Sequence, residues 1–480
     1  MITLDFASQT PLVAQIEQHL RAKIETGYLQ LGTKVPSVRQ LAKQCGVSTP
    51  TVVEAYNRLV ARGFLEPRRA SGYYVAHQPA PPAARERRAP ADLPVDSSWL
   101  VRRVYEEAPF DVQAGCGWLP ADWLYEDGVK AGLRIAGRRH GAYLGRYGTP
   151  QGYLPLRRLL QHRLATQGID APAEQIVLTN GASHALSLLM RLLLRPGDVA
   201  LIDDPGHSNL ISSLRHYGAN VVGVRRTPQG IDAGVLADLA RRHRPRVFFT
   251  NSNLQNPTGT SLKIGAGHHV LQLAELYNFH IVEDDVFGEL QPAQAHSLAA
   301  FDGLRRVIYV QSFSKTISPT LRVGFVACPA DLADELSHLK MLEGLTTSEL
   351  AERIVLAILT EGHHRRYLAS LRERLARAQE FVCGRLQNAG LTLFHRPQAG
   401  LFVWAELPAE ICAETLTRLA ARESIMLAPG ALFRIGEGAP AFRFNVACSD
   451  SPKLYRFFES TLSRHGAGGR ELPLKLVTSA

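Results

Sequence analysis

The stretch that decides the fold of this chain is residues 307–315, which read VIYVQSFSK. The apolar run Val307–Val310 is typical of a strand buried on both faces, and it leads into two serines and a lysine. Hydroxyl groups beside an amine, with Arg322 shortly after, could hold a phosphate next to a reactive nitrogen. A lysine alone is usually a solvated surface charge, so this prediction depends on the sequence around it.

Similar apolar runs recur on both sides of this stretch and alternate with helical patterns of ten or more residues. We predict strands at 176–179, 199–202, 221–224, 247–250, 280–283, 307–310 and 323–328. This alternation is typical of an α/β domain with a large, mainly parallel sheet. Between about 336 and 466, long helical patterns precede strand-like residues 401–404 and 442–446, which indicates a smaller α+β lobe.

Polar residues follow several of these strands, at the sheet edge where α/β domains bind ligands. Asn256 lies in the loop after 247–250, and Asp284 follows 280–283. A carboxylate there can pair with a ring nitrogen and keep it protonated, although an acid at a strand end is also a common helix cap. After 176–179, residues 180–183 open a helix whose backbone amides could hold a phosphate.

The first 77 residues have a different pattern. Apolar residues at every fourth position predict a helix over 11–27, and Ser37 and Ser48 are predicted caps of two further helices that end at Gly46 and Gly63. Residues 64–67 and 72–75 then read as two short strands around a turn at 68–71, which together would form a β-wing. We therefore predict a winged helix-turn-helix.

This arrangement suits a DNA-binding module, although many small helical domains are only structural. The first turn of the third helix carries short hydrogen-bonding residues that could read the major groove, while arginines of the second helix and the wing could bind phosphates. The predicted DNA contacts are Arg39, Ser48, Thr49, Thr51, Arg68 and Arg69. Residues 1–88 hold twelve lysines and arginines against six acids, which is +6 of the net charge of +10.

Residues 77–96 read HQPAPPAARERRAPADLPVD, which is too rich in proline, alanine and charge to bury a core. We predict a DNA-binding domain at 1–77, a linker at 78–107, a second domain at 108–466 and a tail at 467–480. The second domain would comprise a large lobe at about 140–335 and a small lobe at about 336–466. A chain of 480 residues is long enough for several cores.

Other sequence features narrow the class of protein. The six cysteines include no C-x-x-C pair, which argues against a zinc module and a disulfide framework, and no metal site is predicted. The chain start has no export signal pattern, and the most apolar run, 186–194, is short and contains Arg191. We expect a cytoplasmic protein that does not span a membrane.

Residues 35–75, VPSVRQLAKQCGVSTPTVVEAYNRLVARGFLEPRRASGYYV, resemble the winged helix-turn-helix of the GntR family of bacterial repressors along its full length. The resemblance implies binding to a double-stranded DNA operator. Two positions depart from the family pattern: Thr49 stands where arginine is frequent, and residues 70–72 read Ala-Ser-Gly instead of Gly-Ser-Gly. The operator sequence therefore cannot be inferred from the family.

Residues 110–465 resemble fold type I pyridoxal-phosphate enzymes of the aminotransferase family. The resemblance makes Lys315 the catalytic lysine that forms the Schiff base with pyridoxal 5'-phosphate, and Asp284 the partner of its pyridinium nitrogen. The implied cofactor contacts are Ala182, Ser183, His207, Asn256, Asp284, Ser312, Ser314, Lys315 and Arg322, with Tyr147 reaching the cofactor phosphate of the partner subunit. Arg443 would bind the carboxylate of a substrate or effector.

Two cofactor-site positions differ from the family pattern. His207 stands where an aromatic residue usually stacks on the cofactor ring, and Phe287 stands where many relatives have a tyrosine that hydrogen-bonds the ring oxygen. Phenylalanine has no donor for that bond. We expect cofactor binding to survive, whereas efficient transamination is placed in doubt.

The two resemblances together, in this order, are those of the MocR subfamily of GntR-type transcription regulators. They imply a homodimer with a head-to-tail, swapped arrangement, whose DNA binding responds to an amino compound or to pyridoxal phosphate. One alternative is a catalytically active aminotransferase with a vestigial DNA-binding domain. Another is a DNA-binding protein whose large domain serves only for dimerisation.

Overall fold

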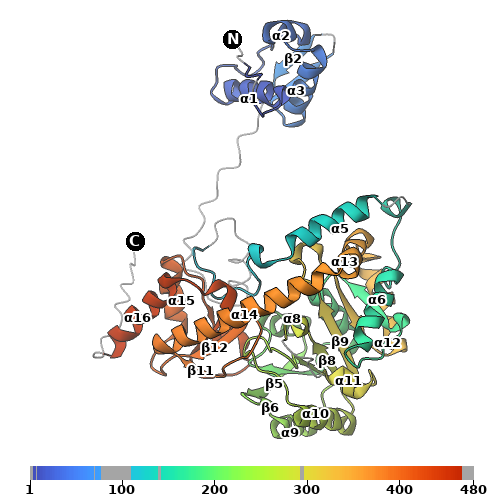
Figure 1. Cartoon of the computed structure of the whole chain (residues 1–480), viewed down its shortest axis with the longest axis vertical. Helices are drawn as coiled ribbons and strands as arrows, with labels where there is room; N and C mark the ends of the chain where they lie inside the picture. The colour runs from blue at the N-terminus through green and yellow to red at the C-terminus, as the bar shows by residue number, and fades with distance from the viewer. Residues whose placement is uncertain are drawn as a thin grey trace. The chain divides into compact units, whose positions relative to one another are not determined.

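A computed structural model of the chain describes residues 4–6, 8–69, 71–76, 110–138, 142–291 and 297–466. The chain divides into two compact units, one up to Pro90 and one from Ala91 (Figure 1). The predicted linker at 78–107 and the predicted tail at 467–480 lie outside the described residues.

The N-terminal unit has the predicted winged helix-turn-helix order. It contains α1 (Leu12–Glu25), α2 (Val38–Cys45), α3 (Thr49–Ala61), and the antiparallel strands β1 (Leu65–Arg68) and β2 (Gly72–Val75). Ser37 caps α2 in a reciprocal pair with Gln40: the Ser37 Oγ accepts from Gln40 N at 3.3 Å, and Gln40 Oε1 accepts from Ser37 N at 3.0 Å. The wing turn is shorter than predicted, because Arg68 pairs with Gly72 in the strand ladder.

The large sheet of the C-terminal unit has eight strands in the order β3-β10-β9-β8-β7-β4-β5-β6. Their bounds are β3 (Ile176–Thr179), β4 (Val199–Asp204), β5 (Asn220–Thr227), β6 (Gly230–Ile231), β7 (Val247–Thr250), β8 (His280–Asp284), β9 (Val307–Ser312) and β10 (Gly324–Ala327). The five strands from β9 to β5 are parallel, whereas β10 is antiparallel to both of its neighbours. The predicted α/β class with a mainly parallel sheet is confirmed.

Helices cover both faces of this sheet, which explains why strands such as β3 and β7 are buried at every residue. Leu201 and Phe248 pack in the core on one face, while Ile202 and Phe249 pack in the core on the other. The helices are α5 (Glu126–Arg138), α6 (Leu154–Ala165), α7 (Ala182–Leu193), α8 (Ser208–Tyr217), α9 (Ala233–His243), α10 (Ile264–Tyr277), α11 (Leu298–Asp302), α12 (Ala330–Gly344) and α13 (Glu349–Thr360).

The small lobe has a four-stranded sheet in the order β11-β12-β14-β13. Its elements are β11 (Thr392–Leu393), β12 (Phe402–Glu406), β13 (Ala428–Pro429), β14 (Ala441–Asn445), α14 (His363–Asn388), α15 (Ala413–Arg422) and α16 (Pro452–Gly466). The long helix α14 contacts both β12 and the large-lobe turn at 288–290 (Figure 1). Among the described residues, no helix combines the length and the apolar character needed to cross a lipid bilayer.

Short 3-10 helices connect these elements. They are η2 (Ala121–Trp123), η3 (Ala142–Gly145), η4 (Ala173–Gln175), η5 (Gly288–Leu290), η6 (Pro319–Leu321), η7 (Gly430–Phe433) and η8 (Val446–Cys448). The last of these follows β14 directly and brings Cys448 close to the segment described next.

A segment far from the small lobe in sequence also packs on it. In this segment, which we call the strap (residues 112–118), Val112 pairs with Ile425, and Gly115 N donates to Met426 O at 2.8 Å. Conversely, Leu336 of α12 and Ile354 of α13 pack in the cores of the large sheet. This packing favours a boundary between the lobes later in the chain than the predicted one near residue 335.

Candidate functional site

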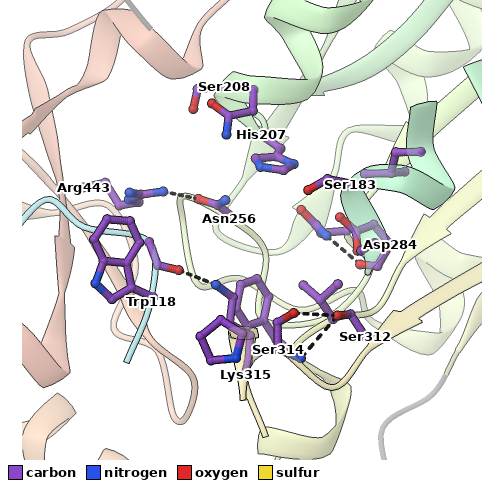
Figure 2. A pocket seen from close by; sticks show the side chains of 18 of the residues that line it. Trp118, Ser183, His207, Ser208, Asn256, Asp284, Ser312, Ser314, Lys315 and Arg443 are labelled. Atoms are coloured by element: carbon purple, nitrogen blue, oxygen red, sulfur yellow. Dashed lines mark hydrogen bonds between the residues drawn. The ribbon is translucent and has the colours of Figure 1, made fainter. Parts of the chain in front are cut away.

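The described residues enclose a cavity of about 520 Å³ between the large sheet and the small lobe. Ten of the predicted site residues line it: Ala182, Ser183, His207, Asn256, Asp284, Ser312, Ser314, Lys315, Arg322 and Arg443. Figure 2 shows Lys315, Asp284, His207 and Arg443 arranged around the same space. Tyr147 is not among the lining residues, and 80% of its surface is exposed.

Lys315 lies shortly after the end of β9 and points into the cavity. Its Nζ donates to the carbonyl oxygen of Gly117 in the strap at 2.7 Å (Figure 2). Burial lowers the pKa of this amine to about 8, because removal from water disfavours the charged form. A larger fraction of Lys315 is therefore an uncharged nucleophile at neutral pH than is usual for lysine.

Asp284 is the last residue of β8 and is buried. Burial raises the pKa of its carboxyl group to about 6, and its Oδ1 accepts no hydrogen bond from the described residues. A buried carboxylate oxygen without a partner is energetically costly. A ligand with a protonated ring nitrogen would supply the missing donor and lower the pKa of Asp284 again.

Another side of the cavity is suited to a phosphate. The first turn of α7 lies there with Ala182 and Ser183, beside Ser312, Ser314 and the guanidinium of Arg322. Gly181 precedes the helix at a φ of +76°, and a Cβ at this position would lie 2.8 Å from Arg322 Nη2. Glycine therefore allows the close approach of Arg322, which also donates to Asn180 O at 2.9 Å. Helix amides, hydroxyls and a guanidinium are all donors that favour a phosphate.

Arg443 on β14 is a buried cation, with 5% of its surface exposed. It donates to Asn256 Oδ1 at 2.9 Å and to Gly115 O at 2.7 Å, and its Nε has no hydrogen-bond partner within the described structure. None of the ion pairs among the described residues involves Arg443. Burial lowers its pKa to about 10, so it remains charged at neutral pH. A ligand carboxylate would complete its coordination.

The two positions that depart from the family pattern also line the cavity. His207 is buried, its Nδ1 has no partner in the described part of the chain, and burial lowers its pKa to about 4, so the ring is neutral at pH 7. Phe287 is buried and packs edge-on against Phe402, with ring centroids 5.5 Å apart. The cavity therefore has an imidazole and a phenyl ring at these positions, and the phenyl ring provides no hydroxyl donor.

The cavity also has lining residues to which no sequence pattern pointed. They include the strap residues Gly115, Gly117 and Trp118, and Asn251, whose side-chain amide donates to the backbone oxygen of Asp284. The strap has no strand or helix periodicity that could have placed it. Its glycines were the available signal, because a Cβ on Gly115 would lie 2.4 Å from Ala428 N.

The N-terminal unit presents its predicted DNA contacts on its surface. Arg39, Ser48, Thr49, Arg68 and Arg69 are exposed, and Thr51 is half-buried. Ser48 Oγ caps α3 and lies 2.8 Å from Thr51 Oγ1, so its hydroxyl already has a structural role. Arg68 donates twice to Glu66, at 2.8 and 2.6 Å, and lies over the ring of Tyr74.

Family models match both units. The description "Bacterial regulatory proteins, gntR family" matches residues 12–75. The description "Aminotransferase class I and II" matches residues 124–460, which is more than half of the chain. The two matches fall on either side of the stretch predicted to be a linker.

Known proteins resemble the chain in one or both units. The probable rhizopine catabolism regulatory protein MocR of Rhizobium meliloti is 30% identical over 89% of this chain and 88% of its own length. The 2-aminoadipate transaminase of Thermus thermophilus is 31% identical over 70% of this chain and 85% of its own length. The crystal structure of LysN, an alpha-aminoadipate aminotransferase from Thermus thermophilus complexed with N-(5'-phosphopyridoxyl)-L-leucine, superposes with a TM-score of 0.68 at 27% identity, over 74% of this chain and 93% of LysN.

Proposed function

Because this chain belongs to the aminotransferase class I and II family, with a gntR-type domain ahead of it as in MocR-type transcription regulators, we propose that an amino compound or pyridoxal phosphate in its cavity controls its binding to DNA. The gntR-type domain implies DNA binding, and the aminotransferase fold implies pyridoxal phosphate as cofactor. Control of DNA binding by a ligand in the cavity is the new part of the proposal.

The cavity fits this cofactor in its charge and its hydrogen-bonding groups. Lys315 would bind the aldehyde carbon, Asp284 would pair with the ring nitrogen, and Asn256 would bond the ring hydroxyl. Ser312, Ser314, Arg322 and the first turn of α7 would hold the phosphate. The cofactor, when bound, supplies an electron sink for a bound amine. The unpartnered Oδ1 of Asp284 supports this fit, because no side chain of the described residues satisfies it.

The observation that carries the proposal is the buried cation of Arg443, which pairs with no carboxylate of the described residues, in the same cavity as the reactive amine of Lys315. This pair of groups favours a ligand that carries both an amine and a carboxylate, that is, an amino acid or a close analogue. Such a ligand can regulate DNA binding only if it binds one DNA-binding arrangement more tightly than another. We propose that lobe closure over the ligand provides this difference.

The dimer belongs to the same proposal. Aminotransferase-fold proteins are typically dimeric, and we propose a head-to-tail, swapped homodimer in which Tyr147 reaches the cofactor phosphate of the partner subunit. The high exposure of Tyr147 supports this role, since no described residue of its own subunit covers most of its surface. Sedimentation should show that the Tyr147→Phe variant remains a dimer. A spectral titration should show that this variant binds pyridoxal phosphate more weakly.

The test uses the full-length protein with a labelled operator fragment. The absorbance spectrum with added pyridoxal phosphate should change when single amino acids are titrated in, and those that change it should also alter operator affinity. Borohydride treatment should attach a phosphopyridoxyl group to Lys315. The Arg443→Lys variant should lose the response to amino acids but keep the response to simple amines, because only the carboxylate contact is weakened. Unchanged ligand-dependent operator binding by Lys315→Ala would refute control through this site.

A catalytically active aminotransferase is the second candidate, favoured by the 31% identity to a 2-aminoadipate transaminase and by the cavity residues just described. The measurement is ketoacid-dependent conversion of the bound cofactor to its amine form. Rapid turnover with a common amino acid would favour the enzyme. Slow turnover that Phe287→Tyr accelerates would support regulation, with the absent hydroxyl as the cause of weak catalysis.

A further inference from the structure

Two cysteine thiols lie in contact behind the wall of the cavity. Cys116 belongs to the strap and Cys448 ends η8, and their Sγ atoms are 3.3 Å apart although 332 residues separate them in sequence. We propose that Cys116 and Cys448 form an oxidisable dithiol, which a peroxide converts to a disulfide and which thereby alters how the cavity holds an amino ligand.

The surroundings of Cys116 stabilise negative charge on its sulfur. Asn445 Nδ2 donates to Cys116 Sγ at 3.2 Å, and the guanidinium of Arg443 lies near enough to contribute. Burial by itself raises the pKa of Cys116, but the contacts with Cys448, Arg443 and Asn445 bring it down to about 7. The hydrogen bond with Cys116 raises the pKa of Cys448. Cys116 is therefore the thiolate of the pair.

The two sulfurs differ in how far solvent and an oxidant can reach them. Only 1% of the surface of Cys116 is exposed, whereas Cys448 is half-buried. Cys448 therefore meets the oxidant and Cys116 completes the bond. In the first step Cys448 passes its proton to the Cys116 thiolate in contact with it, and the Cys448 thiolate so formed attacks one oxygen of hydrogen peroxide. The O–O bond breaks, and the leaving hydroxide takes the proton back from Cys116 and departs as water, so that a sulfenic acid remains on Cys448. In the second step the Cys116 thiolate displaces hydroxide from that sulfur.

The two steps balance in atoms, protons and electrons. Two thiols and one peroxide give one disulfide and two waters, with the hydroxide taking up the proton that Cys116 had released. The sulfurs lose two electrons and the peroxide gains them. A metal site is not favoured at this pair, because no group of three or more possible metal ligands is found among the described residues.

The strap couples this bond to the cavity. A disulfide requires an S–S distance of about 2.05 Å, so the sulfurs must approach each other by roughly 1.2 Å. Cys116 lies between two residues whose carbonyl oxygens accept from the cavity: Gly115 from Arg443 and Gly117 from Lys315, both at 2.7 Å. We expect oxidation to displace these two carbonyl oxygens and thereby to weaken the binding of an amino ligand in the cavity. This consequence rests on the proposed function, whereas formation of the disulfide does not.

The first test measures the bond itself. Full-length protein carrying Cys412→Ser, which removes the exposed thiol, is treated with hydrogen peroxide, alkylated, and mapped by peptide mass spectrometry without reduction. We expect one cross-linked peptide pair containing Cys116 and Cys448, which a reductant separates. If both residues remain alkylatable after a treatment that oxidises methionines, or pair with other cysteines, the proposal is wrong.

The second test measures the consequence. Pyridoxal phosphate and amino-acid titrations of the reduced and oxidised protein should differ, with amino-acid affinity about tenfold weaker after oxidation, as expected for a weakened hydrogen bond to a charged group. Cys448→Ser should show no effect of peroxide, and Cys448→Ala gives the same comparison if the serine variant folds poorly. Equal amino-acid affinities of the reduced and oxidised protein would overturn only the coupling between the disulfide and the cavity. Failure of the reduced protein to bind pyridoxal phosphate would instead overturn the proposed function.

Discussion

The DNA-binding unit and the cofactor cavity are built in opposite ways. In the N-terminal unit, contacts between near neighbours shape the elements that present the exposed side chains, as in the reciprocal pair of Ser37 and Gln40. In the cavity, residues far apart in sequence hold one another, as when Lys315 binds Gly117, 198 positions away. The first site depends on local structure, and the second depends on how the lobes assemble.

The two regions also differ in whether their polar groups are satisfied. Buried cavity atoms without hydrogen-bond partners include Asp284 Oδ1, His207 Nδ1 and Arg443 Nε, whereas no such atom is found in the described part of the N-terminal unit. The cavity therefore requires a ligand to complete its hydrogen bonds, but the winged helix is complete without DNA. Changes in the cavity should have large and ligand-specific effects, while changes on the winged helix should be smaller and salt-dependent.

The largest expected effect tests whether the cavity depends on its buried acid. Asp284→Ala should weaken pyridoxal phosphate binding by roughly a hundredfold, because a charged ring nitrogen loses its buried partner. Operator binding without ligand should not change. Asp334→Asn, at an exposed position on α12, is the matched control and should bind the cofactor normally. Spectral titration measures the affinity of both variants for pyridoxal phosphate. A near-normal affinity of Asp284→Ala would contradict the claim that the cavity, unlike the winged helix, needs a ligand to complete its hydrogen bonds.

The next prediction concerns the pH dependence of the cavity. Only the uncharged amine of Lys315 reacts, and burial lowers its pKa to about 8, so the rate of attachment to pyridoxal phosphate should rise with pH and level off above about 8. A lysine in water would keep gaining rate up to about pH 10.4. Stopped-flow absorbance between about pH 6.5 and 10 measures the rate, and the midpoint of its rise gives the pKa of the reacting amine. Trapping with borohydride shows that the attached amine is that of Lys315. A midpoint near that of free lysine would show that burial does not tune this amine.

A smaller effect is expected on the DNA-binding side. Arg39→Ala should weaken operator binding about tenfold and reduce the slope of affinity against salt concentration by about one, because one phosphate contact is lost. Cofactor titrations should remain unchanged. Arg21→Ala serves as control, since Arg21 is on α1 and donates to Glu25. Gel-shift assays at several salt concentrations would contradict the predicted contact if Arg39→Ala bound normally.

The smallest effect tests the local construction of the N-terminal unit. Ser37→Ala removes the cap of α2 and should lower the free energy of unfolding of this unit by about 1 kcal/mol. Ser37→Gly should cost less, because glycine tolerates the cap conformation. Urea titration followed by circular dichroism of the full chain, with the N-terminal transition resolved by proteolysis, measures the difference. No change on Ser37→Ala would mean that packing, not the cap, holds α2.

Much of the fold could be predicted because it follows from neighbouring residues. The caps at Ser37 and Ser48, the glycine at position 46 with φ of +69°, and the apolar runs of the large sheet are short-range signals. For the same reason, the sequence pattern was enough to place Asp284 at the end of one strand of the large sheet and Asn256 in the loop after another. Their roles came from the family resemblance, not from periodicity.

The sequence by itself determined which segments become helices and strands, because backbone preferences, caps and apolar periodicity act within a few residues. Only the tertiary structure decided what those segments surround. The strap joins the small lobe because Gly115 leaves room for the backbone at Ala428, and that contact brings Gly117 to Lys315 and Cys116 to Cys448. Such contacts depend on burial and shape between distant segments, and no short pattern in the chain encodes them.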